Sequence, residues 1–308
     1  MDQPAQWDIV TGVGFTALAV AALRAIETHR HPDGLVNDPY AAAFVKAAAS
    51  PMPLPTQLDA DLGTEVPWAS MATYMGVRSK FFDDFFAGAS AEGLDQVVLF
   101  AAGLDSRAFR LDWSPATTVY ELDAPKVLEF KDRVLTDQGA RAQCVRRTLA
   151  VDLREDWPSA LLKAGFDPSR RTVWLAEGLL PFLPDDAKVG LFSRVHQLSP
   201  AGSRIAAEHI SGDMTTLRQE IHGMAQKMIL WMAQRTEVDM AGIPSAAESA
   251  AEFWPGEQNY DPAQWLASHG WEISTNQAPT VAHSYHRPLD DTTPLFHRSG
   301  LFLTAEAR

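Results

Sequence analysis

The most constraining feature of this sequence lies between residues 97 and 123. A continuous apolar run at 97–100 leads into the small-residue turn Ala101-Ala102-Gly103, and a second strand-like run at 118–122 ends on Asp123. Asp123 follows Gly103 by 20 residues. In a βαβ nucleotide-binding unit, small residues let the backbone approach the ligand, and a carboxylate after the second strand binds a pair of ribose hydroxyls. The pattern therefore predicts such a unit.

The rest of the chain continues this alternation of strands and helices. Strands alternating with helical patterns imply a parallel sheet with right-handed crossovers. We expect strands at 96–100, 117–122, 144–150, 171–176 and 203–209, and the tail returns to strand-like segments at 270–275 and 298–304. Helices are expected at 10–30, 38–49 and 67–87, the second of them opening with Asp38 as N-cap and Pro39 in the first helical position.

Residues 211–250 interrupt the alternation with a helical segment that contains five methionines, namely Met214, Met224, Met228, Met232 and Met240. Methionines and Trp231 there offer an adaptable apolar wall, so we expect this insert, with the N-terminal helices, to form a mobile cover over a substrate pocket. A rigid packing element or a dimer contact is the alternative. The expected parts are an N-terminal helical cap at 1–90, a cofactor-binding core at 91–210, the insert, and a completion of the sheet at 251–308.

Composition narrows the classes of function. The chain has 308 residues and a formal net charge of −13, which disfavours nucleic acid and anionic membranes as partners. The apolar run at 10–23 is too short to span a bilayer and lacks a basic flank, so we expect a cytoplasmic protein. Cys144 is the only cysteine, and His283 and His286 lack further ligands at metal-binding spacing, so no metal site is expected.

Further acids follow the third and fourth predicted strands. Asp152 and Leu153 stand after the third strand, where a carboxylate and a backbone N–H can bind the amino group and a ring nitrogen of adenine. Glu177 follows the fourth strand, and Arg78 lies in the helix before the first, an arginine being suited to a ligand carboxylate. Each has a structural alternative: a helix cap for Asp152, a surface acid for Glu177, and a solvated helix face for Arg78.

These motifs together resemble the leucine carboxyl methyltransferase family, in particular its actinobacterial branch of S-adenosylmethionine-dependent O-methyltransferases. The resemblance spans almost the whole chain. The segments that match the family are the opening at 13–22, Asp38-Pro39-Tyr40-Ala41, Arg78 before Phe81-Phe82-Asp83-Asp84, the loop 101–107, Glu121-Leu122-Asp123, Glu177-Gly178-Leu179-Leu180, and the tail motifs Asp261-Pro262 and His269-Gly270-Trp271.

The resemblance implies an α/β fold, that is, a class I methyltransferase Rossmann-like doubly wound sheet with an N-terminal helical extension and a helical lid insert. It also implies that S-adenosylmethionine binds with its methionine carboxylate at Arg78, its methionine backbone at Gly103 and its amino group at Glu177. Asp123 would hold the ribose, and Asp152 with Leu153 the adenine. Ala101 departs from the family's Gly-Ala-Gly, and its methyl group would crowd the cofactor slightly.

The expected reaction is O-methylation of a small, apolar acid or hydroxyl-bearing metabolite. A carboxylate acceptor needs no general base, whereas a phenol or enol does. His209, at the end of the fifth strand, is the one candidate base, although a histidine bonded to a nearby loop is the simpler interpretation. The absence of a clear base favours a carboxyl acceptor. The alternatives are an NAD(P)-dependent oxidoreductase, which the missing G-x-G-x-x-G disfavours, and a catalytically silent cofactor-binding protein.

Overall fold

The computed structural model describes residues 13–30, 32–48, 54–235 and 260–308. Within these residues one sheet has the strand order β3-β2-β1-β4-β5-β7-β6. Its strands are β1 (Gln96–Phe100), β2 (Thr118–Asp123), β3 (Val145–Ala150), β4 (Thr172–Ala176), β5 (Arg204–Ile210), β6 (Trp271–Gln277) and β7 (Gly300–Ala307). The five expected strands and the two strand-like segments of the tail are therefore confirmed, within three residues at each end.

The first five strands are parallel, and β7 runs antiparallel between β5 and β6. In the register, Gln96 of β1 lies beside Thr118 of β2 on one side and Thr172 of β4 on the other. The chain thus leaves β1 in one direction for β2 and β3 and returns to its other side with β4. Ligands of open α/β sheets bind at such a reversal, outside the carboxyl ends of the strands.

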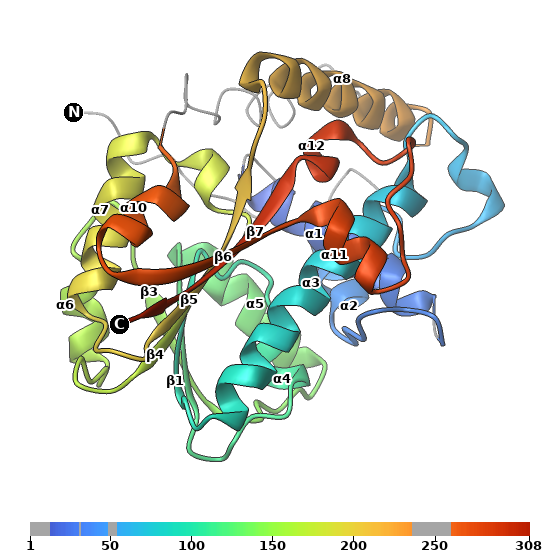
Figure 1. Ribbon diagram of the computed structural model, residues 1–308. Coiled ribbons are helices and arrows are strands. Elements are labelled where there is room, and N and C mark those ends of the chain that lie inside the picture. Colours follow the sequence, from blue (N-terminus) through green and yellow to red (C-terminus); the bar gives the residue numbers. More distant parts are fainter. Residues whose placement is uncertain (1–12, 31, 49–53, 236–259) are drawn as a thin grey trace, which may run out of the picture.

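Helices cover both faces of the sheet (Figure 1). The helices that precede residue 211 are α1 (Val13–His29), α2 (Ala41–Ala47), η1 (Ala60–Leu62), α3 (Trp68–Ala91), α4 (Arg107–Arg110), α5 (Pro125–Asp137), α6 (Trp157–Lys163), η2 (Leu180–Phe182) and α7 (Asp185–Gln197). They are followed by α8 (Met214–Ala233), α10 (Pro262–Ser268), α11 (Ala278–Ser284) and α12 (Leu295–Arg298). In Figure 1, β5 leads up to α8, which lies beyond that end of the sheet.

Burial of alternate residues on β1 explains the layered core. Val97 and Leu99 pack into the cluster that includes α1 and α3, whereas Val98 and Phe100 pack into the cluster that includes α6 and α7. Successive side chains of a strand point to opposite faces, so a strand covered on both sides is apolar throughout. The continuous apolar run in the sequence is the consequence of this double burial.

One local expectation was wrong. Helix α2 begins at Ala41 with Tyr40 as its N-cap, so Asp38 does not cap it and Pro39 is not its first residue. The Asp38 carboxylate instead accepts hydrogen bonds from the Tyr40 backbone N–H at 3.1 Å and from Arg24 of α1 at 2.9 Å. Arg24 also donates to the Leu104 carbonyl at 2.7 Å, so this buried pair attaches α1 to the loop after β1.

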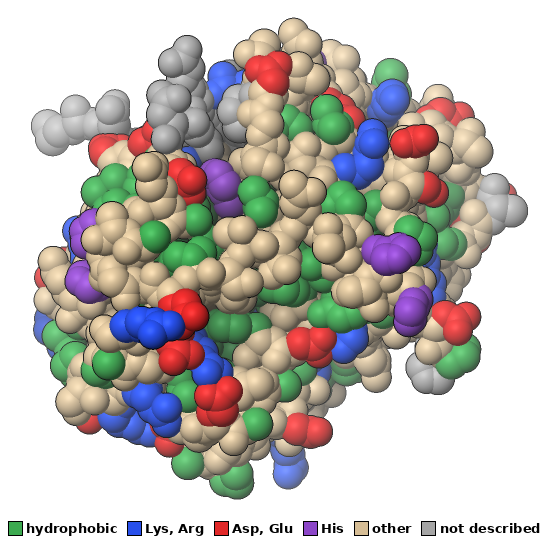
Figure 2. Space-filling model, viewed as in Figure 1, with side chains coloured by type: hydrophobic (Ala, Val, Ile, Leu, Met, Phe, Trp, Pro, Cys, Tyr) green, Lys and Arg blue, Asp and Glu red, His purple; other side chains and the backbone are tan. Residues whose placement is uncertain are grey.

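Among the described residues, no helix is long and apolar enough to cross a membrane. On the face drawn in Figure 2, basic side chains lie interspersed with acidic ones.

Candidate active site

A large cavity opens at the carboxyl ends of β1 to β5. Its volume is about 1260 Å³, above the roughly 300–1,000 Å³ of a pocket for one drug-sized ligand. The residues predicted to bind the cofactor all line it: Arg78, Ala101, Gly103, Asp123, Asp152, Leu153 and Glu177. The structure thus brings together side chains that are almost a hundred residues apart in the sequence.

Asp123 and the turn after β1 form the first part of the lining. The Asp123 carboxylate accepts hydrogen bonds of 2.6 Å from the backbone N–H groups of Gly103 and of Ala124. Burial nevertheless raises the pKa of Asp123, because desolvation outweighs these two bonds. Gly103 and Ala101 both have a φ of 47°, a conformation that glycine adopts readily and alanine does not.

Asp152 and Leu153 lie at the end of β3. Asp152 does not cap the next helix, because the N-cap of α6 is Asp156. Its carboxylate instead accepts from the backbone and side chain of Arg154, and the side-chain bond holds its pKa below the usual value. Asp152 is about one-third exposed, so it remains accessible from the cavity.

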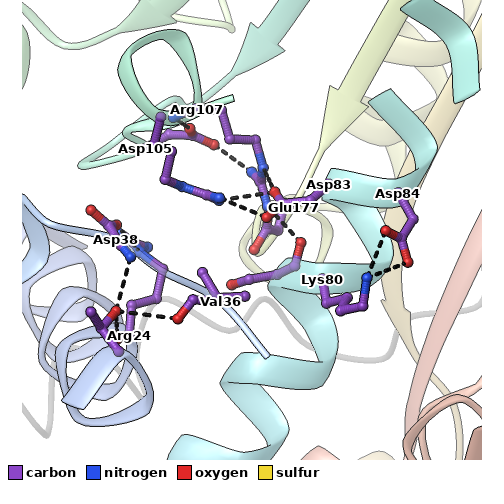
Figure 3. A network of polar contacts seen from close by, with 12 residues as sticks. Arg24, Val36, Asp38, Lys80, Asp83, Asp84, Asp105, Arg107 and Glu177 are labelled. Atoms are coloured by element: carbon purple, nitrogen blue, oxygen red, sulfur yellow. Dashed lines mark hydrogen bonds and ion pairs between the residues drawn. The ribbon is translucent and has the colours of Figure 1, made fainter. Parts of the chain in front are cut away.

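Glu177, after β4, lies between two arginines. Its Oε1 is 2.8 Å from Arg78 Nε, and its Oε2 accepts a 2.8 Å hydrogen bond from Arg107 Nη1. Arg107 also pairs with Asp105 and with Asp83, as Figure 3 shows, and Arg110 pairs with the same Asp83. Burial disfavours the Asp105 carboxylate, but Arg107 outweighs this effect and lowers its pKa to about 2. Arg107 ends the loop 101–107, and the sequence alone predicted no role for it.

A second glutamate, which the sequence analysis missed, pairs with Arg78. Glu208 of β5 accepts from Arg78 Nη1 at 2.9 Å and from the Gly178 backbone N–H at 2.9 Å. The Tyr74 hydroxyl of α3 donates to the other oxygen of Glu208. Burial, and then Glu208, raises the pKa of Tyr74 well above 10, so the phenol stays protonated and remains a donor. Tyr74, Arg78 and Glu208 all line the cavity.

His297 of α12 is the histidine of the cavity lining. Its ring stacks on Tyr74 with 4.2 Å between ring centroids and 11° between planes. The side chain is buried, and its Nδ1 has no hydrogen-bond partner within the described part of the chain. Burial, and then the charge of Arg78, lowers the pKa of His297 well below 6.5. The imidazole is therefore neutral at neutral pH.

The structure does not bring His209 to the cavity lining. Lys188 of α7 and Asp261, beside α10, are among the charges that act on it, so it lies toward the helices on the other side of β5. Burial and Lys188 lower its pKa. Because side chains alternate along a strand, Glu208 occupies the cavity side where His209 was expected.

Apolar side chains of α1, α3 and α8 form the remaining wall. They include Phe15, Val20, Leu23, Met71, Met75, Ile221, Met224, Met228, Ile229 and Met232. Trp231 does not join them: it packs on Trp68 with 5.2 Å between centroids, and its indole N–H donates to the Leu62 carbonyl. Met240 lies outside the described residues.

The described ranges contain no group of three or more His, Cys, Asp or Glu placed to hold a metal ion. Cys144 is half-buried, and burial raises its thiol pKa to about 12. The thiol is thus protonated at neutral pH and unreactive.

Known proteins of one family are similar to this chain over most of its length. Residues 17–196 match the model of the family described as leucine carboxyl methyltransferase. A protein of Saccharopolyspora erythraea is 44% identical over 98% of both chains, and one of Rhodococcus jostii is 44% identical over 92% of this chain and 91% of its own. Both carry the name of an S-adenosyl-L-methionine-dependent methyltransferase.

Among solved structures, a protein from Thermobifida fusca described as a methyltransferase is similar in fold. It aligns with a TM-score of 0.50 over 95% of this chain and 94% of its own, at 13% sequence identity. This likeness concerns the fold alone.

Proposed function

The chain belongs to the leucine carboxyl methyltransferase family and is an S-adenosylmethionine-dependent methyltransferase, and from this premise we propose that it methylates an oxygen atom of a small, apolar molecule. The observation that carries the proposal is the cavity itself. One side is lined by acids at successive strand ends, Asp123, Asp152 and Glu177, and the other by the apolar side chains of α1 and α8. The first side fits the cofactor, and the second fits the acceptor.

The polar side suits the shape of S-adenosylmethionine. Asp123 would accept hydrogen bonds from the ribose hydroxyls, and Asp152 with the Leu153 backbone would bind adenine. Glu177 would accept from the amino group, and Arg78 would bind the carboxylate through its remaining N–H groups. At Gly103 a Cβ would have no atom nearer than 3.7 Å, so this part of the loop leaves room for the ligand.

Charge supports the same assignment. The network around Glu177 holds three arginines, at 78, 107 and 110, and four acids, at 83, 105, 177 and 208. Its formal charge is therefore −1. The methionine part of the cofactor carries a sulfonium, an ammonium and a carboxylate, with a net charge of +1. A buried network of the opposite sign stabilises that group.

The cofactor supplies an electrophilic methyl group on a positively charged sulfur. The protein's own contribution is to hold the acceptor oxygen in line with that methyl group and to keep water away. Both a carboxylate and a hydroxyl fit the apolar wall. The sequence favoured a carboxyl acceptor because it showed no clear general base. His297 lines the cavity and is a candidate for such a base, so this reason for a carboxyl acceptor is weaker.

Two measurements test the proposal. Calorimetry should detect binding of S-adenosylhomocysteine but not of NAD. The protein should then transfer a labelled methyl group to an organic extract of Saccharopolyspora erythraea, the source of a close relative. Alkali releases methanol from methyl esters and leaves methyl ethers intact, so the treated product tells a carboxyl from a hydroxyl acceptor. Label on an amine, a thiol or a macromolecule would contradict the proposal.

A further inference from the structure

His297 and Tyr74 form a closely packed pair of rings in the cavity lining. Gly300 follows α12 at the start of β7, and a Cβ at this position would lie 2.8 Å from the Tyr74 hydroxyl oxygen and 3.1 Å from the His297 carbonyl oxygen. Only glycine leaves the space that both residues occupy. Glu220 of α8 accepts hydrogen bonds from the backbone N–H groups of Leu295 and Phe296, at 2.7 and 2.9 Å, and so fixes the start of α12. The backbone of α12 is thus fixed at its start, and the imidazole stacks on Tyr74.

The group is continuous with the cofactor side of the cavity. Glu177 pairs with Arg78, Arg78 pairs with Glu208, and Glu208 accepts from Tyr74, whose ring stacks on His297. This chain of contacts leads from the expected position of the methionine part to the imidazole. His297 lines the same cavity as Arg78, whose charge acts on it, so the imidazole lies on the side of the cavity where the methionine part of the cofactor is expected.

We propose that His297 accepts the proton of a weakly acidic hydroxyl group, such as a phenol or an enol, while the oxygen of that group takes the methyl group. This inference rests on the proposed function, because it names the acceptor group of the same site. The bond between oxygen and the methyl carbon forms, and the bond between that carbon and sulfur breaks. The electron pair stays on sulfur, which becomes a neutral thioether, and the hydroxyl proton passes to a ring nitrogen of His297. The positive charge thus moves from sulfur to the imidazole.

The charges near His297 favour an acceptor with a neutral hydroxyl group over an acceptor with a carboxylate. Arg78 forms ion pairs with Glu177 and Glu208, and its remaining N–H groups are expected to bind the cofactor carboxylate, so its charge is already shared by three carboxylates. Glu208 would repel a second carboxylate. His297 lines the cavity, and a neutral imidazole has one ring nitrogen that can accept the proton of an O–H group.

Four elements near His297 carry charged or titratable groups. They are Tyr74 and Arg78 on α3, Glu208 on β5, Glu220 on α8, and Arg298 beside His297 on α12. Because burial and Arg78 keep the imidazole neutral, it is ready as a base across the neutral pH range. An oxygen that is gaining a methyl group becomes strongly acidic, so even a weakly basic imidazole suffices.

The test uses a pair of probes on one scaffold, 2-naphthol and 2-naphthoate, with S-adenosylmethionine and the whole protein. The variants are His297→Gln and His297→Phe, the second of which keeps an aromatic ring against Tyr74. His209→Gln is the matched control, since His209 lies off the cavity. Binding of S-adenosylhomocysteine is measured for every variant. If the unaltered protein does not bind it, the proposed function itself fails.

We expect methylation of 2-naphthol at a rate that stays nearly constant from pH 7 to 9. Both His297 variants should lose about 10²- to 10⁴-fold at pH 7, the range typical of general-base catalysis. Their residual rate should rise about tenfold per pH unit toward the pKa of the phenol, near 10, because the ionised phenol needs no base. A merely structural role of His297 would not produce this slope.

Three outcomes would overturn the inference. The first is transfer to 2-naphthoate in preference to 2-naphthol. The second is a His297 variant with an unchanged rate and pH profile. The third is a failure of 2-naphthol to bind to the protein loaded with S-adenosylhomocysteine. In each case a normal affinity for S-adenosylhomocysteine leaves the proposed methyltransferase function intact.

Discussion

The carboxylate of Asp123 accepts a 2.6 Å hydrogen bond from the backbone N–H of Gly103, so the ends of β2 and β1 are joined at the cavity. A second bond of 2.6 Å from the Ala124 N–H holds the other carboxylate oxygen. Each oxygen keeps further lone pairs for a ligand. The spacing of 20 residues seen in the sequence thus corresponds to a direct contact between two strand ends.

Replacement of this carboxylate should weaken cofactor binding. Its charge-assisted bonds to the ribose hydroxyls contribute roughly 1.5–3 kcal/mol, so Asp123→Ala should raise the Kd for S-adenosylhomocysteine about 10- to 150-fold. Calorimetry measures the Kd, and circular dichroism checks that the variant is folded. Asp112→Ala removes an exposed acid and should leave the Kd unchanged. An unaltered Kd in a folded Asp123→Ala protein would remove Asp123 from the site.

The same residue predicts a dependence on pH. Burial raises the pKa of Asp123 above its ordinary value of 3.8, and the ribose hydroxyls donate to the ionised form. The affinity for S-adenosylhomocysteine is therefore complete above the raised pKa and is lost as the pH falls through it. The loss should begin at a higher pH than for an exposed aspartate. Calorimetry from pH 7 downward measures it.

Asp123→Asn serves as the reference for that titration. The ligand's own carboxyl group titrates near 3.3–3.7, and the asparagine variant reports this contribution alone. If both proteins show the same pH dependence, Asp123 does not titrate in contact with the cofactor.

Backbone strain at Ala101 predicts a stabilising substitution. A non-glycine residue in the left-handed conformation costs about 1–2 kcal/mol, and the added freedom of glycine in the unfolded chain returns about 0.4–1 kcal/mol of this. Ala101→Gly should thus raise the free energy of unfolding by up to about 1.5 kcal/mol. Urea denaturation measures it. Ala102→Gly, at the buried neighbour without a positive φ, should lower it by roughly 0.5–1 kcal/mol, and equal effects would argue against strain.

Arg107 carries much of the electrostatic stability of the site. Arg107→Met leaves Asp105 and Glu177 without their shared partner, and loss of one member of a buried ion pair costs about 3–5 kcal/mol. Unfolding in urea should show a loss of this size. Arg154→Met breaks an exposed pair with Asp152 and should cost less than about 1 kcal/mol. A similar, small loss for both would mean that solvent screens the Arg107 network.

The fold and the cofactor side were accessible from sequence because both depend on local pattern. Buried parallel strands are apolar runs, and the acids that follow them meet at one edge whatever the helices do between them. Asp123, Asp152 and Glu177 are such acids. Predicting these residues required only the order of the strands along the chain, and no knowledge of how distant segments pack.

The acceptor side depends on packing that sequence does not reveal. Glu208 and His209 are neighbours, and only the facing of β5 decides which of them lines the cavity. His297 reaches it from α12, which the antiparallel strand β7 follows, and no motif marks that residue. Trp231 looked like part of the apolar wall, but Trp68 and the Leu62 carbonyl hold it on the other side of α8.

We expect the cover of the acceptor pocket to move. The described part of the insert is α8, whose Met224, Met228 and Met232 line the cavity, so displacement of α8 would open it. The N-terminal helix α1 lines the same wall, but its buried Arg24 pairs with Asp38 and donates to the Leu104 carbonyl. Helix α8 is bound through Glu220 to α12 and through Trp231 to the Leu62 carbonyl, neither of which is an ion pair. We therefore expect α8 to move together with these segments, and to move more than α1.

Hydrogen exchange followed by mass spectrometry measures this difference. Amides of α8 should exchange more slowly when S-adenosylhomocysteine and 2-naphthol are both bound, whereas α1 should change less, because its anchor is present in both states. Helix α6 does not line the cavity and serves as the reference for global stabilisation by the ligands. Equal protection of α8 in the free and the bound protein would make it a rigid wall. Water would then be excluded by the ligands themselves, without closure of the chain over them.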